Sequence, residues 1–132
     1  AVNQQTPGDG PRMSYDIEFT TTGTYYVHVR GWAADFDDNS LHVGVDGTWP
    51  ESGIRMYWCS AWFGSWAWSS NLEGSGGECG MADSAQIQID APGMHTVSFA
   101  MREDGFELDK VVLTTQAGFT PSGQGPPETL GQ

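Results

Sequence analysis

The sequence predicts an all-β domain, an antiparallel β-sandwich of the jelly-roll type, on three observations. Short segments in which apolar and polar residues alternate recur along the chain, and clusters of Gly, Pro, Asn and Asp separate them. No segment of helical length carries apolar residues at the spacing i, i+3, i+4, i+7. The chain holds 18 Gly and 7 Pro without a fixed period, which indicates many turns and excludes a collagen-like repeat.

Three alternating segments open the predicted sandwich. In residues 13–19 every second side chain is apolar, and Ser, Asp and Glu lie between them. A second strand is expected in residues 25–30, where Tyr and Val form one face and Tyr, His and Arg the other. The third segment, residues 41–45, repeats this pattern and ends at Asp46-Gly47, a pair typical of tight turns.

Three further segments of the same kind follow in the second half of the chain. Residues 85–89 and 96–101 alternate regularly, and residues 90–93 form a turn between them. A turn at residues 104–105 precedes the last predicted strand, residues 106–115. About seven short strands in all favour two sheets packed face to face.

The chain of 132 residues is expected to form one domain. We expect a loose leader at residues 1–12, which are polar and rich in turn formers, and the sandwich at residues 13–115. Residues 116–132 have the Pro, Gly and Ser content of a linker toward another module. No run of 18 apolar residues is present that could span a membrane.

The charge and the cysteine content of the chain indicate which binding partners to expect and where the protein acts. Five Lys and Arg stand against 17 Asp and Glu, which gives a net charge of −12. Such a surface repels polyanions, so nucleic acid, anionic membranes and strongly acidic polysaccharides are not expected partners. Because the chain is acidic, poor in Lys, rich in Trp and has an even number of cysteines, we expect a secreted, extracellular and monomeric domain.

The two cysteines, Cys59 and Cys79, are interpreted as a disulfide. The alternative is two reduced thiols that do not contact each other. Closing a loop of about 20 residues would stabilise the fold by ~3 kcal/mol in the chain-entropy account of disulfides.

An aromatic segment at residues 49–68 holds five of the six Trp of the chain, in surroundings rich in Gly and Ser. An exposed indole can cover the flat C–H face of a sugar ring, while nearby polar side chains bind its hydroxyl groups. The alternative is that about half of the six Trp are core residues. Trp66 and Trp68 share one face if their segment is extended, and Trp58 and Trp62 are candidates from the composition of the segment alone.

Two sets of residues in the sequence have side chains that can ligate a metal ion, but neither follows a known metal-binding motif. The three histidines, His28, His42 and His95, match no short zinc motif, and we interpret them as polar-face residues. Residues 35–39 gather Asp and Asn but lack the Gly and terminal Glu of an EF-hand loop, which favours a solvated loop.

Two further groups of acids are of interest. Asp109 is expected to share a strand face with Val111 and Leu113, so its carboxylate needs a partner, either a structural calcium ion or turn N–H groups. Glu103, Asp104 and Glu107 are close in sequence, which is a weak basis for the paired acids of glycoside hydrolysis. No motif indicates catalysis, and we predict no catalytic residue.

An ordered set of motifs between residues 13 and 115 resembles a known family. The set consists of GTYYVHVR at residues 23–30, DNSLHVGVDG at 38–47, WAW at 66–68, PGMHTV at 92–97 and REDGFELDKVVL at 102–113. Together these motifs are similar to secreted bacterial β-sandwich modules of carbohydrate-binding module families 6 and 35. They also resemble the C-terminal module of glycoside hydrolase family 115.

The resemblance implies a jelly roll that binds glycans as an accessory module of a polysaccharide-degrading enzyme. It carries the sugar-stacking roles of the family to Trp32 and to Trp66 or Trp68. Glu107 takes the place of a polar residue that is usually Asn in the family, and Asp109 matches one end of a structural calcium site. The Glu pair that completes this calcium site in relatives is absent here.

We therefore expect a non-catalytic module that binds a neutral polysaccharide, a β-glycan such as a β-glucan, cellulose or xylan, and targets an attached enzyme to it. The expected ligand-binding residues are Trp32, Trp58, Trp62, Trp66, Trp68, Arg102 and Glu107. The alternatives are a small secreted glycan-active enzyme, a hydrolase or lyase, and an adhesion or surface structural module.

Overall fold

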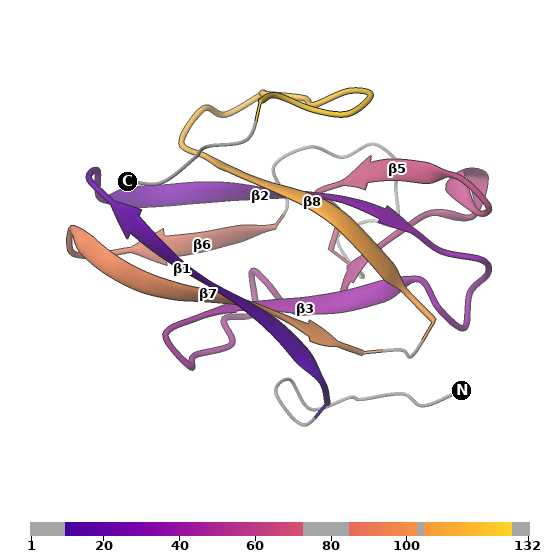
Figure 1. Ribbon diagram of the computed structural model, residues 1–132, viewed down its shortest axis with the longest axis horizontal. Coiled ribbons are helices and arrows are strands. Elements are labelled where there is room, and N and C mark those ends of the chain that lie inside the picture. The colour runs from indigo at the N-terminus through magenta and orange to yellow at the C-terminus, as the bar shows by residue number, and fades with distance from the viewer. Residues whose placement is uncertain (1–9, 73–84, 103–104, 128–132) are drawn as a thin grey trace.

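In the computed structural model of the chain, the described residues form eight strands in two antiparallel sheets (Figure 1). The structure describes residues 10–72, 85–102 and 105–127. The strands are β1 (Arg12–Phe19), β2 (Gly23–Trp32), β3 (Ser40–Val45), β4 (Met56–Tyr57), β5 (Trp66–Ser69), β6 (Gln86–Ile89), β7 (Gly93–Met101) and β8 (Glu107–Thr114), with one 3-10 turn, η1 (Ser60–Trp62). The predicted all-β antiparallel sandwich is confirmed.

Strand β2 is the centre of the sheet that carries the candidate site. Strand β8 pairs with one edge of β2, while β6 and β5 share the other edge, β6 along its first half and β5 along its second. The other sheet has the order β1-β7-β3-β4. We call the two sheets the β2 sheet and the β7 sheet. The chain passes from one sheet to the other in most of its connections, as in a jelly roll.

Alternation along the strands decides which side chains form the core. Val27 and Val29 of β2 are fully buried against the β7 sheet, and His28 between them faces outward. The other strand residues of the core are Phe19, Leu41, Val43, Met56, Ile87, Ile89, Val97 and Phe99. The apolar alternation in the sequence therefore predicts the buried faces of β2, β3, β6 and β7 correctly.

Residues 115–127, here called the C-terminal strap, lie across the outer face of the β2 sheet, the face turned away from the β7 sheet. The Phe119 ring lies 6.0 Å from the ring of His28, an outward residue of β2, in edge-to-face geometry. On β8, Nζ of Lys110 donates to the carbonyl oxygen of Gln124 at 2.8 Å. Figure 1 shows the strap in yellow beside β2 and β8. Residues 116–127, expected to be a linker, are thus packed against the sandwich.

At the other end of the chain, only residues 10–12 of the predicted leader are described, and Arg12 already begins β1. Within the described residues no helix has the length and apolar content needed to cross a membrane.

An Asp–His pair joins the turn after β3 to β7. Nδ1 of His95 lies 2.5 Å from Oδ2 of Asp46, whose other oxygen accepts the N–H of Thr96 at 2.9 Å. Nε2 of His95 faces the carbonyl oxygen of Ala91 at 2.7 Å, so both ring nitrogens have an acceptor and the imidazolium form fits. The hydrogen bond to Asp46 raises the pKa of His95, and the same bond, followed by that from Thr96, lowers the pKa of Asp46.

The contribution of this pair to stability should fall as pH rises through the raised pKa of His95. The contribution of the raised His95 pKa is complete below the ordinary His pKa of 6.5. The contribution of Asp46 is lost only at much lower pH, as pH falls through the lowered pKa of this carboxyl group. The melting temperature of the parent chain should exceed that of His95→Gln most clearly near pH 5.5, and the difference should shrink by pH 9.

The control for this measurement is Glu18→Gln, an exposed acid on β1, which should show no such pH-dependent difference. A difference between the parent and His95→Gln that stays constant from pH 5.5 to pH 9 would contradict the imidazolium assignment.

Candidate functional site

Three of the predicted residues meet on the outer face of the β2 sheet. Trp32, the last residue of β2, is paired with Trp66 of β5 on one side and with Glu107 of β8 on the other. Gly31 next to Trp32 faces the core, since a Cβ atom there would lie 2.1 Å from the ring of Phe106, so Trp32 faces outward. We call Trp32 and Trp66 the aromatic platform.

Trp66 is the more open of the two indoles, with 42% of its surface exposed at the start of the edge strand β5. Trp32 is half-buried, and Glu107 beside it is exposed. A flat apolar ring next to an exposed carboxylate, at the end of a sheet, offers both stacking and hydrogen-bond acceptance to a ligand.

An ion pair lies directly beside the platform. Nη1 of Arg30 donates to Oδ2 of Asp109 at 2.6 Å. Cζ of the same guanidinium group lies 5.3 Å from the centroid of the Trp66 ring, within the range of a cation–π contact. Arg30 thus connects the carboxylate on β8 with the indole on β5.

The outward position of Asp109 differs from the sequence expectation, which placed it on the face of Val111 and Leu113. That expectation is wrong because β8 contains a bulge: Leu108 pairs with Gly31 and Lys110 with Arg30, so Asp109 is one residue extra. Leu108 and Val111 both pack against the core, and Asp109 is exposed. Among the described residues no three His, Cys, Asp or Glu side chains gather into a metal-binding group. Calcium at Asp109 stays a prediction.

Trp68 lies on the outer face, two residues after Trp66, but the C-terminal strap holds it. Its Nε1 donates to the carbonyl oxygen of Gly123 at 2.9 Å. Gly125 of the strap, at φ +81°, sits so close that a Cβ atom there would lie 2.5 Å from the indole ring. Trp68 therefore forms a boundary of the platform, and the strap occupies the sheet face beyond it.

Two candidates from the sequence are buried elsewhere. Trp58 is 1% exposed, with its ring 4.4 Å from that of Phe106 and its Nε1 bonded to the carbonyl oxygen of Ala67 at 2.9 Å. Arg102, after β7, is 9% exposed and donates from Nη1 to Oγ of Ser40 at 2.8 Å. Both side chains are buried away from the aromatic platform, and ligand contact by them stays a prediction.

The remaining predicted residues have separate positions. Trp62 of η1 is partly buried against the core. His28 and His95 lie on different sheets, and the ring of His42 accepts the N–H of Arg55 at Nδ1, so the three histidines do not gather. Glu103 and Asp104 lie outside the described residues.

The predicted disulfide also involves a position outside the described residues. Cys59 is buried, and Nδ2 of Asn71 lies 3.6 Å from its sulfur. Cys79 belongs to residues 73–84, of which the structure gives no description, so the bond stays a prediction.

Sequence reasoning missed Phe36, which is 70% exposed in the loop between β2 and β3. Its ring lies 5.0 Å from that of Phe63 in edge-to-face geometry. The N–H of Gly64 donates to the carbonyl oxygen of Ala33 at 2.9 Å and so joins this loop to the segment before Trp66. The signal in the sequence was a single aromatic residue among acids, Asp35-Phe36-Asp37-Asp38.

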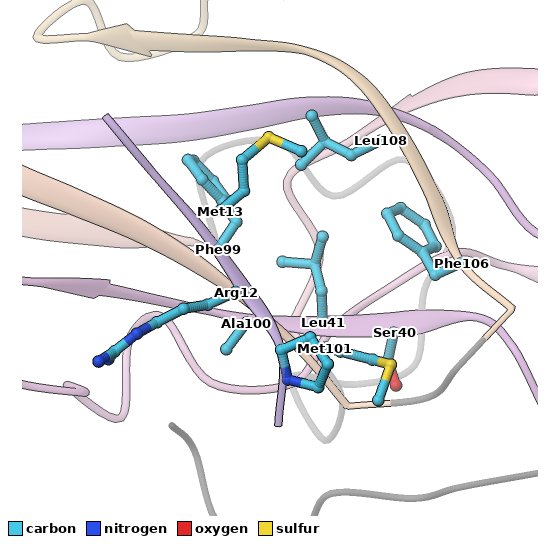
Figure 2. A pocket seen from close by; sticks show the side chains of 10 residues that line it. Arg12, Met13, Ser40, Leu41, Phe99, Ala100, Met101, Phe106 and Leu108 are labelled. Carbon is cyan, nitrogen blue, oxygen red and sulfur yellow. The ribbon is translucent and has the colours of Figure 1, made fainter. Parts of the chain in front are cut away.

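A separate apolar groove of about 290 Å³ lies between β1 and β8 (Figure 2). Figure 2 shows Met13, Leu108 and Phe106 along it, and Arg12 is the charged side chain at its border. Of the described residues that line this groove, none belongs to the predicted site.

The chain matches a family model and a curated protein. Residues 1–128 match the family model described as the glycosyl hydrolase family 115 C-terminal domain, so the matched region includes the strap. The chain is 44% identical over 124 residues to protein P23 of Formosa agariphila, described as uncharacterized. This match covers 94% of the chain and 30% of the relative. No solved structure matches the chain.

The division of the tryptophans into core and platform is testable by mutation. Trp58→Ala should lower the free energy of unfolding by about 3–5 kcal/mol, because it leaves a cavity under Phe106. Trp66→Ala should lower it by clearly less, about 1 kcal/mol, since 42% of this residue's surface is exposed and no core cavity forms beneath it. Equilibrium urea unfolding measures both, and an equal loss in the two variants would show that Trp66 is a core residue.

Proposed function

Because this chain belongs to the family of glycosyl hydrolase family 115 C-terminal domains, we propose that it is a non-catalytic module that binds a neutral polysaccharide on the aromatic platform. The family relationship supports the role of an accessory domain of a glycoside hydrolase. The chain spans 30% of the length of the relative P23, which is in keeping with attachment to further modules of a secreted enzyme.

The observation that carries the proposal is the exposed indole of Trp66 beside Trp32 and Glu107. Burying an indole face against the C–H face of a pyranose ring removes apolar surface from water, and the indole loses little conformational freedom. Glu107 can accept hydrogen bonds from sugar hydroxyl groups next to the stacked ring.

Charge supports a neutral ligand. The chain carries a net charge of −12, so a polyanionic glycan meets long-range repulsion that salt screens only in part. The guanidinium group nearest to the platform, that of Arg30, is already paired with Asp109. A neutral β-glycan, such as a β-glucan, cellulose or xylan, therefore fits the platform better than a uronic acid polymer.

The proposal assigns no chemical step to the chain. The acids of β8 beside the platform are Glu107 and Asp109, and the carboxylate of Asp109 accepts a hydrogen bond from Arg30. A general acid–base pair needs both carboxyl groups free to reach the scissile bond. If the purified chain released reducing sugars from a polysaccharide that it binds, the non-catalytic assignment would be wrong.

Affinity electrophoresis against a panel of neutral and acidic polysaccharides should show retardation by a neutral β-glycan. With that glycan, Trp66→Ala and Trp32→Ala should each weaken binding about ten- to a hundredfold, which corresponds to ~1–3 kcal/mol, as for aromatic anchors at interfaces. Calorimetry provides the dissociation constants.

The matched control is Trp49→Ala, since this indole packs on Gly44 of the β7 sheet, away from the platform, and its loss should leave binding unchanged. Unchanged binding in both platform variants, with the fold intact, would remove the platform from the proposal. Retardation by acidic glycans alone would contradict the neutral ligand.

A further inference from the structure

We propose that Asp109 and Arg30 are positioning residues that hold the Trp66 indole in one orientation, with one face covered and the other available to a ligand. The ligand-binding part of this inference rests on the function proposed above. The positioning itself concerns the free protein and can be measured without any glycan.

Trp66 needs such support because of its place in the sheet. It is the first residue of β5, an edge strand that pairs with β2 over four residues. Its neighbour across the pair is Trp32, and β5 has no further strand partner among the described strands. An indole with 42% of its surface exposed at the end of an edge strand can occupy several rotamers unless a neighbour restricts it.

Arg30 provides that restriction. The guanidinium carbon lies 5.3 Å from the Trp66 ring centroid, so this planar group packs near one face of the indole. A free Arg side chain has many rotamers and would be a poor support. Here the Nη1–Oδ2 bond of 2.6 Å to Asp109 anchors its end, and Arg30 is itself mostly buried.

The bulge in β8 is what makes the anchor possible. With regular alternation, Asp109 would point into the core, on the side of Val111. The extra residue turns its carboxylate to the outer face, next to Arg30 on the central strand. The strap holds Lys110 and Trp68 on the same face, so the surroundings of Arg30 are held as well.

The consequence for binding is preorganisation. A stacking residue that is ordered before the ligand arrives does not lose rotamer freedom on binding. Asp109 would act through Arg30, and Arg30 through Trp66, without either of them touching the sugar.

The test uses the full chain labelled with 5-fluorotryptophan, which gives one fluorine NMR resonance for each of the six Trp. Loss of one line in Trp66→Phe assigns Trp66, and Trp58→Phe assigns the core reference. Asp109→Ala and Arg30→Met should each shift and broaden the Trp66 line, while the Trp58 line stays in place.

Two further variants separate positioning from a general loss of structure. Asp109→Ala added to Arg30→Met should cause no further change, because both substitutions remove the same support. Asp109→Glu should restore the Trp66 line at least in part, since it keeps a carboxylate. The control is Glu18→Ala, an exposed acid on the opposite sheet, which should leave the Trp66 line unchanged.

An unchanged Trp66 line in Asp109→Ala and Arg30→Met, or additive changes in the double variant, would overturn the proposal. If all six lines collapse together in Asp109→Ala, which would indicate unfolding, Asp109→Asn takes its place, because Asn keeps the size of the side chain and one oxygen acceptor. A collapse of the Trp58 line in that variant too would assign Asp109 to fold stability and also overturn the proposal.

Binding of the neutral glycan identified by electrophoresis completes the test. Asp109→Ala and Arg30→Met should weaken it by the same factor, roughly two- to fivefold, as expected for loss of a surface cation–π support. A loss in Arg30→Met alone would mean that Arg30 contacts the sugar directly, against the positioning role. If the NMR result holds but no glycan binds, the positioning stands and the proposed function fails.

Discussion

The pairing of β2 with three other strands is the constraint on which the rest of the structure depends. Its inward residues, Val27 and Val29, close the core against the β7 sheet, and its outward residues, Arg30 and Trp32, stand on the opposite face. Each outward residue is therefore placed by a hydrogen-bonded partner on both sides. The platform is a by-product of core formation, since the same alternation that buries the valines exposes the Arg and the Trp.

Much of this arrangement can be predicted from the sequence, because apolar residues at every second position indicate a strand with one buried face. The core faces of β2, β3, β6 and β7 follow from it, and so does the outward direction of Trp66 relative to Ala67. The family resemblance pointed to Trp32, Trp66 and Glu107, which the structure brings together as cross-strand neighbours. The short strands β4 and β5 are harder to predict, because the aromatic segment around them does not alternate over a long enough stretch.

Other features could not be predicted, for physical reasons. The bulge at Asp109 is a matter of backbone pairing, and a polar residue among Val and Leu gives the same sequence pattern whether it faces in or out. The burial of Trp58 depends on space beneath Phe106 that exists because Gly31, on strand β2, has no side chain. The strap has the composition of a linker, and two of its attachments use the backbone carbonyls of Gly123 and Gln124, which any residue would supply.

The bulge also gives β8 one more outward position than a regular strand would have between Leu108 and Val111. Leu108 and Val111 face the core from opposite sides of the extra residue. Deleting one of the two residues between them would restore regular alternation and leave both in the core, but it would remove the extra outward position that Asp109 occupies beside Arg30. Point substitutions at the outward positions carry no such penalty. During divergence this surface can therefore change its chemistry one residue at a time, whereas a deletion at the bulge would remove one polar position from it without disturbing the core.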